Sequence, residues 1–265
     1  MNNIYNEFFT TLKEYLVTLE IDKKHKGIEG CSSQEIESIE KRKGNLPIAY
    51  KEYLKSIGKK FLFEFMDAED MAFDDLDYIE QFGGKVFKTN QFKMERPYMV
   101  ISERRNEYIT LIYLDKGNNP KTWIMSKYWD EEEKGKNLEI RTDSFTDLIL
   151  VFFQQSLINF PFTFNWVTEE DQKDKDVVEK RYINWFRNLQ SIEEKIKSNS
   201  SKNTLVKQLN DKFLDYYLPS KSTIIEELNK SNFGTTINNV KKTDNIAPQN
   251  SNKNKIIKWI KKLFN

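Results

Sequence analysis

The sequence predicts an α+β domain in which N-terminal helices pack on an antiparallel sheet, followed by a C-terminal α-helical extension. Three observations predict this order. Apolar residues recur at helical spacing over the first 58 residues, alternate at strand spacing between residues 97 and 125, and return to helical spacing after Trp166. With 265 residues, of which 38% are hydrophobic and 31% charged, the chain is long enough for a core and typical of a globular protein.

Three helices are predicted at the start of the chain. Apolar residues at spacings of three and four indicate an amphipathic helix over 3–20. Ser32 and Glu35 form a capping box, which predicts a second helix at about 33–43. Pro47 suits the first turn of a third helix, because the N–H that proline lacks has no partner in a first turn.

The middle of the chain is predicted to supply the sheet. Alternating phenylalanines predict a half-buried strand over 61–65, and further strands are expected at 97–102, 107–114 and 121–125. The last two are separated by the turn-forming residues 115–120, so we expect them to pair as an antiparallel hairpin.

Two further helices are predicted within the same region. A short helix is expected over 74–82, with a break at Gly83 and Gly84. A strongly apolar helix at about 145–159 begins after the capping residue Ser144, and its composition suits packing against a sheet.

The remainder of the chain is expected to be an appendage to an α+β domain at 1–165. Two apolar stripes predict a helical hairpin over 166–230, whose second helix is expected to end at Pro219. Residues 231–254 are rich in Asn, Lys, Thr and Ser, and we expect a flexible linker there. Residues 255–265 are expected to form a basic amphipathic helix.

An acidic run is the densest unusual feature of the sequence. Seventeen residues without Lys or Arg contain the candidate partner-binding residues Glu64, Asp67, Glu69, Asp70, Asp74, Asp75, Asp77 and Glu80. Such a run raises a negative potential over one surface region, which attracts a cationic partner. A solvated helix face or loop remains the alternative interpretation, and a metal ion held by several of these carboxylates also stays open.

The basic tail is a second candidate contact region. Lysines surround an apolar face in the pattern of a segment that lies on anionic lipid. Docking on a partner protein or on the chain's own body is the alternative. The residues concerned are Lys255, Ile256, Lys258, Trp259, Ile260, Lys262, Leu263 and Phe264.

The sequence offers no catalytic set, no metal-ligand set and no cofactor motif, so we expect a protein that is not an enzyme. His25 is the only histidine and Cys31 the only cysteine, which excludes ordinary zinc sites and a disulfide within the chain. The part of the sequence that is expected to fold contains no basic stripe with interleaved aromatic residues. We therefore expect no direct contact with nucleic acid. With one cysteine and no signal peptide at the N-terminus, the expected location is cytoplasmic.

Two motifs resemble the opening of the SUKH superfamily, which includes yeast cell-wall assembly regulators and many bacterial immunity proteins. They are Ser32-Ser33-Gln34-Glu35-Ile36-Glu37-Ser38-Ile39-Glu40 and Gly44-Asn45-Leu46-Pro47-Ile48-Ala49-Tyr50-Lys51-Glu52-Tyr53-Leu54-Lys55-Ser56-Ile57-Gly58. The order of elements over about 30–160 is also similar to the family. Lys59 departs from it, because a second glycine is usual at that position.

The resemblance implies an α+β domain without catalytic residues that neutralises a cognate toxin by binding it. If the toxin is a nuclease, the carboxylates of the acidic run would occupy its phosphate-binding surface. The alternative is a regulatory or scaffolding module for protein interaction, as in the eukaryotic members, with weak peripheral membrane contact through 255–265.

Overall fold

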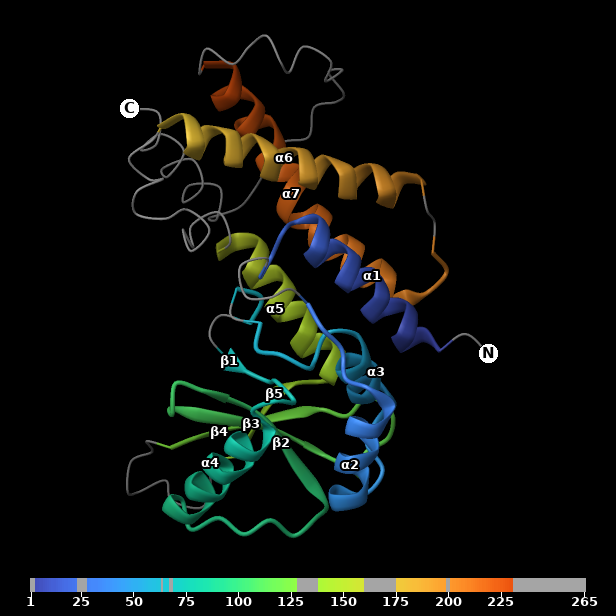
Figure 1. Cartoon of the computed structure of the whole chain (residues 1–265), viewed down its shortest axis with the longest axis vertical. Coiled ribbons are helices and arrows are strands. Elements are labelled where there is room, and N and C mark those ends of the chain that lie inside the picture. Colours follow the sequence, from blue (N-terminus) through green and yellow to red (C-terminus); the bar gives the residue numbers. More distant parts are fainter. Residues whose placement is uncertain are drawn as a thin grey trace. The chain divides into compact units, whose positions relative to one another are not determined.

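The protein was analysed as a computed structural model, and its α+β class agrees with the sequence prediction (Figure 1). By its internal contacts the chain divides into two compact units, residues 1–163 with 201–209 and residues 164–200 with 210–265. The structure describes residues 3–22, 28–62, 64–66, 69–127, 138–159, 175–198 and 201–230.

Three helices open the chain, as the sequence predicts. They are α1 (Ile4–Thr18), α2 (Ser33–Lys43) and α3 (Ile48–Ser56). The capping box of α2 is present in both directions, since the Ser32 side chain accepts from the Glu35 N–H and the Glu35 carboxylate accepts from the Ser32 N–H. The α3 helix packs against α1, α2 and the later helix α5 (Phe145–Asn159).

The sheet has five strands, which are all antiparallel and follow one another in chain order. The three strands expected between residues 97 and 125 are confirmed as β2, β3 and β4. Arg105 and Asn106, both at positive φ, make the tight β2–β3 turn. The five strands are β1 (Glu69–Asp70), β2 (Tyr98–Arg104), β3 (Tyr108–Tyr113), β4 (Thr122–Ser126) and β5 (Glu139–Thr142).

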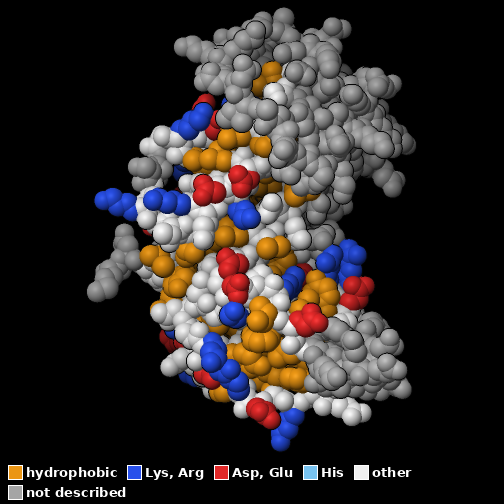
Figure 2. Space-filling view, turned by 180° about the vertical axis from the view of Figure 1, so that it is seen from behind, with side chains coloured by type: hydrophobic (Ala, Val, Ile, Leu, Met, Phe, Trp, Pro, Cys, Tyr) orange, Lys and Arg blue, Asp and Glu red, His pale blue; other side chains and the backbone are white. Residues whose placement is uncertain are grey.

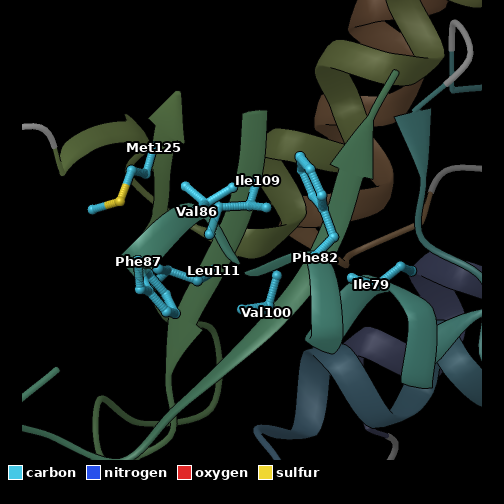
Figure 3. Close-up of a cluster of buried hydrophobic side chains, with 8 residues drawn as sticks. All are labelled: Ile79, Phe82, Val86, Phe87, Val100, Ile109, Leu111 and Met125. Atoms are coloured by element: carbon cyan, nitrogen blue, oxygen red, sulfur yellow. The ribbon is translucent and has the colours of Figure 1, made fainter. Parts of the chain in front are cut away.

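One face of the sheet is covered by α4 (Leu76–Thr89), which contacts β2 and β3. Figure 3 shows the apolar cluster between them, which consists of Ile79, Phe82, Val86, Phe87, Val100, Ile109, Leu111 and Met125. The expected helix break at Gly83 and Gly84 is wrong, because α4 passes through both. A Cβ at Gly83 would lie 2.7 Å from a methyl group of Val100, so glycine at this position allows the helix to approach the sheet closely.

The opposite face of the sheet is directed towards α5. Side chains alternate along a strand, so Thr110 of β3 faces away from the cluster that holds Ile109 and Leu111. Above this face, Phe152 of α5 packs against Phe65, with ring centroids 6.3 Å apart.

The strand expected over 61–65 is wrong for its described residues. The Met66 N–H donates to the Leu62 carbonyl in a turn, and the edge strand β1 forms further along the chain. The physical reason lies in Asp22, a buried residue whose carboxylate accepts the N–H groups of Glu64 and Phe65. These two amides are therefore occupied by a side chain rather than by a neighbouring strand.

The second unit contains α6 (Lys175–Ser198) and most of α7 (Thr204–Lys230). Their contacts include the Phe186 and Tyr217 rings, 6.2 Å apart, and a 2.7 Å ion pair between Glu193 and Lys221. The expected end at Pro219 is wrong, because α7 continues through this proline. Tyr217, two residues before Pro219, is fully buried. Tertiary packing therefore stabilises the helix across a residue of poor helix propensity.

Candidate functional site

The acidic run is divided by the fold into buried carboxylates that hold the domain together and carboxylates at the surface. Glu64 and Glu69 are 6% and 1% exposed, so neither presents its charge to solvent. Asp74 and Asp77 are exposed, and Asp70, Asp75 and Glu80 are partly buried. Asp67 lies outside the described residues. The surface available to a partner is therefore narrower than the run in the sequence.

Glu64 joins two segments by hydrogen bonds: the residues that follow α1 and the residues that follow α3. Its carboxylate accepts the Asp22 N–H at 2.5 Å, while Asp22 accepts the Glu64 N–H at 3.1 Å. Asp22 has a φ of 56°, and its side chain satisfies two backbone donors in return. The role of Glu64 in this structure is thus within the domain.

Glu69 is the centre of a buried polar network on the α5 side of the sheet. Arg141 donates to both of its carboxylate oxygens, at 2.5 and 2.8 Å. Ser102, Tyr108 and Thr110 donate to the same carboxylate. Although burial opposes its charge, the hydrogen bonds and charge of Glu69 raise the pKa of Arg141. Arg141 therefore stays protonated and contacts Glu69 in a bidentate arrangement.

Asp70 lies beside other carboxylates. It is directly opposite Glu103 in the β1–β2 ladder, and its carboxylate accepts the Ala72 N–H at 2.9 Å. Burial, with the charges of Asp75 and Glu103, raises the pKa of Asp70 to about 7. At neutral pH this position therefore carries only part of a negative charge.

Replacing Asp70 with asparagine should make the protein less sensitive to alkaline pH. Because the pKa is raised in the folded state, the stabilisation is complete below the ordinary pKa near 4 and is lost as the pH rises through about 7. The asparagine side chain would stay neutral and still accept the Ala72 N–H. We expect Asp70→Asn to be more stable than the original protein by about 1–2 kcal/mol at pH 8, after allowance for partial exposure, with little difference at pH 4.

Urea unfolding of both proteins at pH 4 and pH 8 measures this effect. Asp74→Asn is the matched control, because Asp74 is an exposed carboxylate of the same segment. A constant stability difference between the Asp70→Asn protein and the original protein across this range would contradict the assignment.

The carboxylates on α4 are paired with the end of α2. Asp77 accepts from Arg42 at 2.8 Å, and Glu80 forms a 2.9 Å ion pair with Lys43. Since these basic residues lie in the last turn of α2, they also interact favourably with the carbonyl end of that helix. The negative potential at Asp77 and Glu80 is thus partly compensated. Asp74 is exposed, and its charge is one of those that raise the pKa of Lys59.

Apolar contact area is also present near these charges. Tyr78 is 45% exposed on the first turn of α4, and its hydroxyl donates to Asn106 in the β2–β3 turn at 2.8 Å. Large aromatic residues commonly dominate binding energy at protein interfaces. At the start of α4, charge and apolar area therefore lie side by side. Figure 2, which views the molecule from the side opposite to Figure 1, shows that hydrophobic side chains also gather between charged ones on the lower part of that face.

Sequence reasoning missed Tyr78, Asn106 and Arg141. No motif distinguishes them, because each gains its role from a residue far along the chain. The β2–β3 turn places Asn106 within hydrogen-bond distance of Tyr78 on α4. The pairing of strands in the sheet places Arg141 within hydrogen-bond distance of Glu69. The only available signal was the position of Tyr78 among the carboxylates of the acidic run.

Several sequence candidates fall outside the described residues. They are His25 and the whole basic tail from Lys255 to Phe264. Across the part of the chain that the structure describes, no group of three or more His, Cys, Asp or Glu side chains could hold a metal ion. No helix in that part has both the length and the apolar composition needed to cross a membrane.

The family comparison matches residues 30–150, which include the acidic segment and the sheet, to the model described as SMI1 / KNR4 family (SUKH-1). Neither a curated protein nor a solved structure matches the chain.

Proposed function

We propose that the chain is an immunity protein of the SUKH superfamily, whose SMI1 / KNR4 family model matches residues 30–150, and that it binds and neutralises a cognate toxin without catalysis. The observation that carries this proposal within the molecule is the exposed part of the acidic run, beside an exposed aromatic residue. Asp74 and Asp77 provide charge at the surface, and Tyr78 provides apolar area. This combination fits a protein partner with a cationic surface, such as a nuclease toxin.

Electrostatic attraction suits an immunity protein because capture must precede damage. Complementary charge raises the rate at which two proteins associate, and this effect weakens as salt screens the charges. Rim charges act mainly on association, whereas a desolvated aromatic anchor acts mainly on dissociation. The acidic residues and Tyr78 therefore have separable roles in the proposed interface.

Reversing two surface charges should slow capture of the toxin. In the Asp74→Lys/Asp77→Lys protein, which reverses two exposed charges, we expect the association rate constant to fall about tenfold at low salt, with a smaller change at high salt. The measurement is stopped-flow association with the product of the toxin gene beside this gene in its host. Glu37→Lys, an exposed charge reversal on α2, is the control.

One outcome of this experiment would contradict the proposed interface, and another would contradict the proposed function. Association that is unchanged in the double variant would remove the acidic surface as the interface and leave the binding function intact. Failure of the neighbouring toxin, or of any protein, to bind the original chain would overturn the immunity function itself.

The basic tail supports a second candidate function, a regulatory or scaffolding module that touches the membrane surface. Its favouring observation is the amphipathic pattern of 255–265, where lysines surround Ile256, Trp259 and Ile260. Deleting 231–265 separates the two functions. Full toxin neutralisation without these residues supports immunity, whereas loss of co-sedimentation with vesicles of anionic phospholipid supports the regulatory or scaffolding function.

A further inference from the structure

The two edge strands of the sheet are joined by side chains that meet above its central strand. Glu69 reaches from β1 across β2, and Arg141 reaches from β5 across β4. Both are hydrogen-bonded to the Thr110 hydroxyl of β3, where it donates to Glu69 at 3.1 Å and accepts from Arg141. We call the pair of Glu69 and Arg141 the clasp. It connects the two edge strands across the three strands between them.

Apolar and aromatic groups enclose the clasp. The Arg141 guanidinium lies 5.4 Å from the ring centroid of Phe152 on α5 and 5.4 Å from that of Tyr108 on β3. Glu69 is 1% exposed and the Arg141 side chain 17%. An ion pair shielded in this way is screened weakly by solvent, so the loss of either partner would leave a buried charge.

Each edge strand is short and has few backbone bonds of its own. β1 has two residues, which pair only with Arg104 and Glu103. β5 has four residues, and its pairing with β4 shifts register between Thr122 and Trp123. Short strands with an irregular ladder are weakly held by backbone bonds alone. The side-chain clasp therefore supplies a connection that the ladders lack.

The residue directly after Glu69 belongs to the acidic surface. Asp70 lies opposite Glu103 on the neighbouring strand, and like charges in that arrangement repel each other. Further along, the N–H groups of Phe73 and Asp74 donate to the carbonyls of Gly58 and Lys59. The segment after β1 is thus held by the end of α3 and the residues that follow it, while β1 itself depends on the clasp.

We propose that Arg141 is a positioning residue for the acidic surface, which acts through Glu69 to hold Asp70 against Glu103. The bidentate contact stabilises β1 and offsets the repulsion between the two carboxylates. Glu103 is only 8% exposed, so Asp70 is the member of this pair that a cationic side chain of the partner would meet, on a preformed strand rather than a mobile segment. This use of the surface rests on the proposed function, whereas the coupling of Arg141 to Asp70 does not.

Arg141→Lys in the full chain tests the coupling, because lysine keeps the charge and cannot form the bidentate pair. We expect amide hydrogen exchange at residues 69–72 to accelerate by about tenfold or more, with unchanged exchange at 109–112 in β3 and at Phe73 and Asp74. We also expect the carboxyl carbon of Asp70, followed by NMR, to titrate at a lower pH than the midpoint of about 7 in the original protein. A general loss of packing would instead accelerate all of these amides together.

Two more variants keep the test decisive. Thr110→Val removes one hydroxyl from the clasp and should give a smaller change in the same direction, which is informative if Arg141→Lys folds poorly. Lys121→Met removes an exposed ion pair with Asp143 beside β5 and should change neither measurement. Unchanged exchange at 69–72 and an unchanged Asp70 titration in both clasp variants would overturn the proposal. Toxin binding enters none of these measurements, so failure of the immunity function would be recognised separately.

Discussion

Replacing Phe145 with alanine should lower the free energy of unfolding by about 3–5 kcal/mol. Phe145 is fully buried at the start of α5, where its ring meets Tyr50 and Tyr53 edge-to-face with centroids 5.4 and 5.6 Å away. Phe9 of α1 lies 6.4 Å away. One ring thus fills the space between α1, α3 and α5, and its removal leaves a cavity that three packed helices cannot close without moving.

Chemical denaturation at neutral pH measures this change. Val151→Ala is the matched control on the same helix, because Val151 is 40% exposed and should cost less than about 1 kcal/mol. A loss below about 1 kcal/mol for Phe145→Ala would show that the aromatic cluster is not the joint between these helices.

Gly30→Ala should destabilise the protein by on the order of 3 kcal/mol. An added Cβ would lie 1.7 Å from the Lys55 carbonyl oxygen and 2.5 Å from its carbon. These are backbone atoms at the end of α3, so no side-chain rotation can relieve the clash. Separation of the two segments would also strain flanking hydrogen bonds, from Cys31 N–H to Leu54 and from Lys59 N–H to Glu29.

Gly84→Ala is the control for this substitution and should act in the opposite direction. Gly84 lies on the exposed side of α4, with no atom within 4 Å of an added Cβ. Alanine in a helix interior is about 0.5–1 kcal/mol more favourable than glycine. Thermal unfolding of the two variants should therefore show a large decrease for Gly30→Ala and a small increase for Gly84→Ala. Equal stability of the two variants would contradict the close approach of Gly30 to α3.

Local signals in the sequence predicted the elements that depend on local interactions. The capping box at Ser32 and Glu35 placed the start of α2 at the observed residue, because both hydrogen bonds join neighbours in the chain. Strands β2 to β4 were predicted because their apolar residues and the turn at 115–120 are contiguous. The order of these elements was also sufficient to suggest the family.

Elements that depend on distant residues were not predictable in this way. β5 escaped notice because Glu139–Thr142 contains one apolar residue and is a strand only through its pairing with β4. The continuation of α4 through Gly83 depends on Val100, which lies seventeen positions further along the chain. Likewise, the sequence shows how many carboxylates the acidic run contains. It does not show that Glu64 is hydrogen-bonded to Asp22 and that Glu69 is paired with Arg141.

The two sides of α4 are under different constraints. Ile79, Phe82 and Gly83 rest on the sheet, and any side chain added at Gly83 would push the helix away from Val100 of β2. Asp77, Tyr78 and Gln81 are exposed and lie outside the apolar cluster, although Tyr78 donates a hydrogen bond to Asn106 in the β2–β3 turn. Substitutions among these outward residues could therefore change what this side of the helix recognises, while the apolar cluster underneath stays the same.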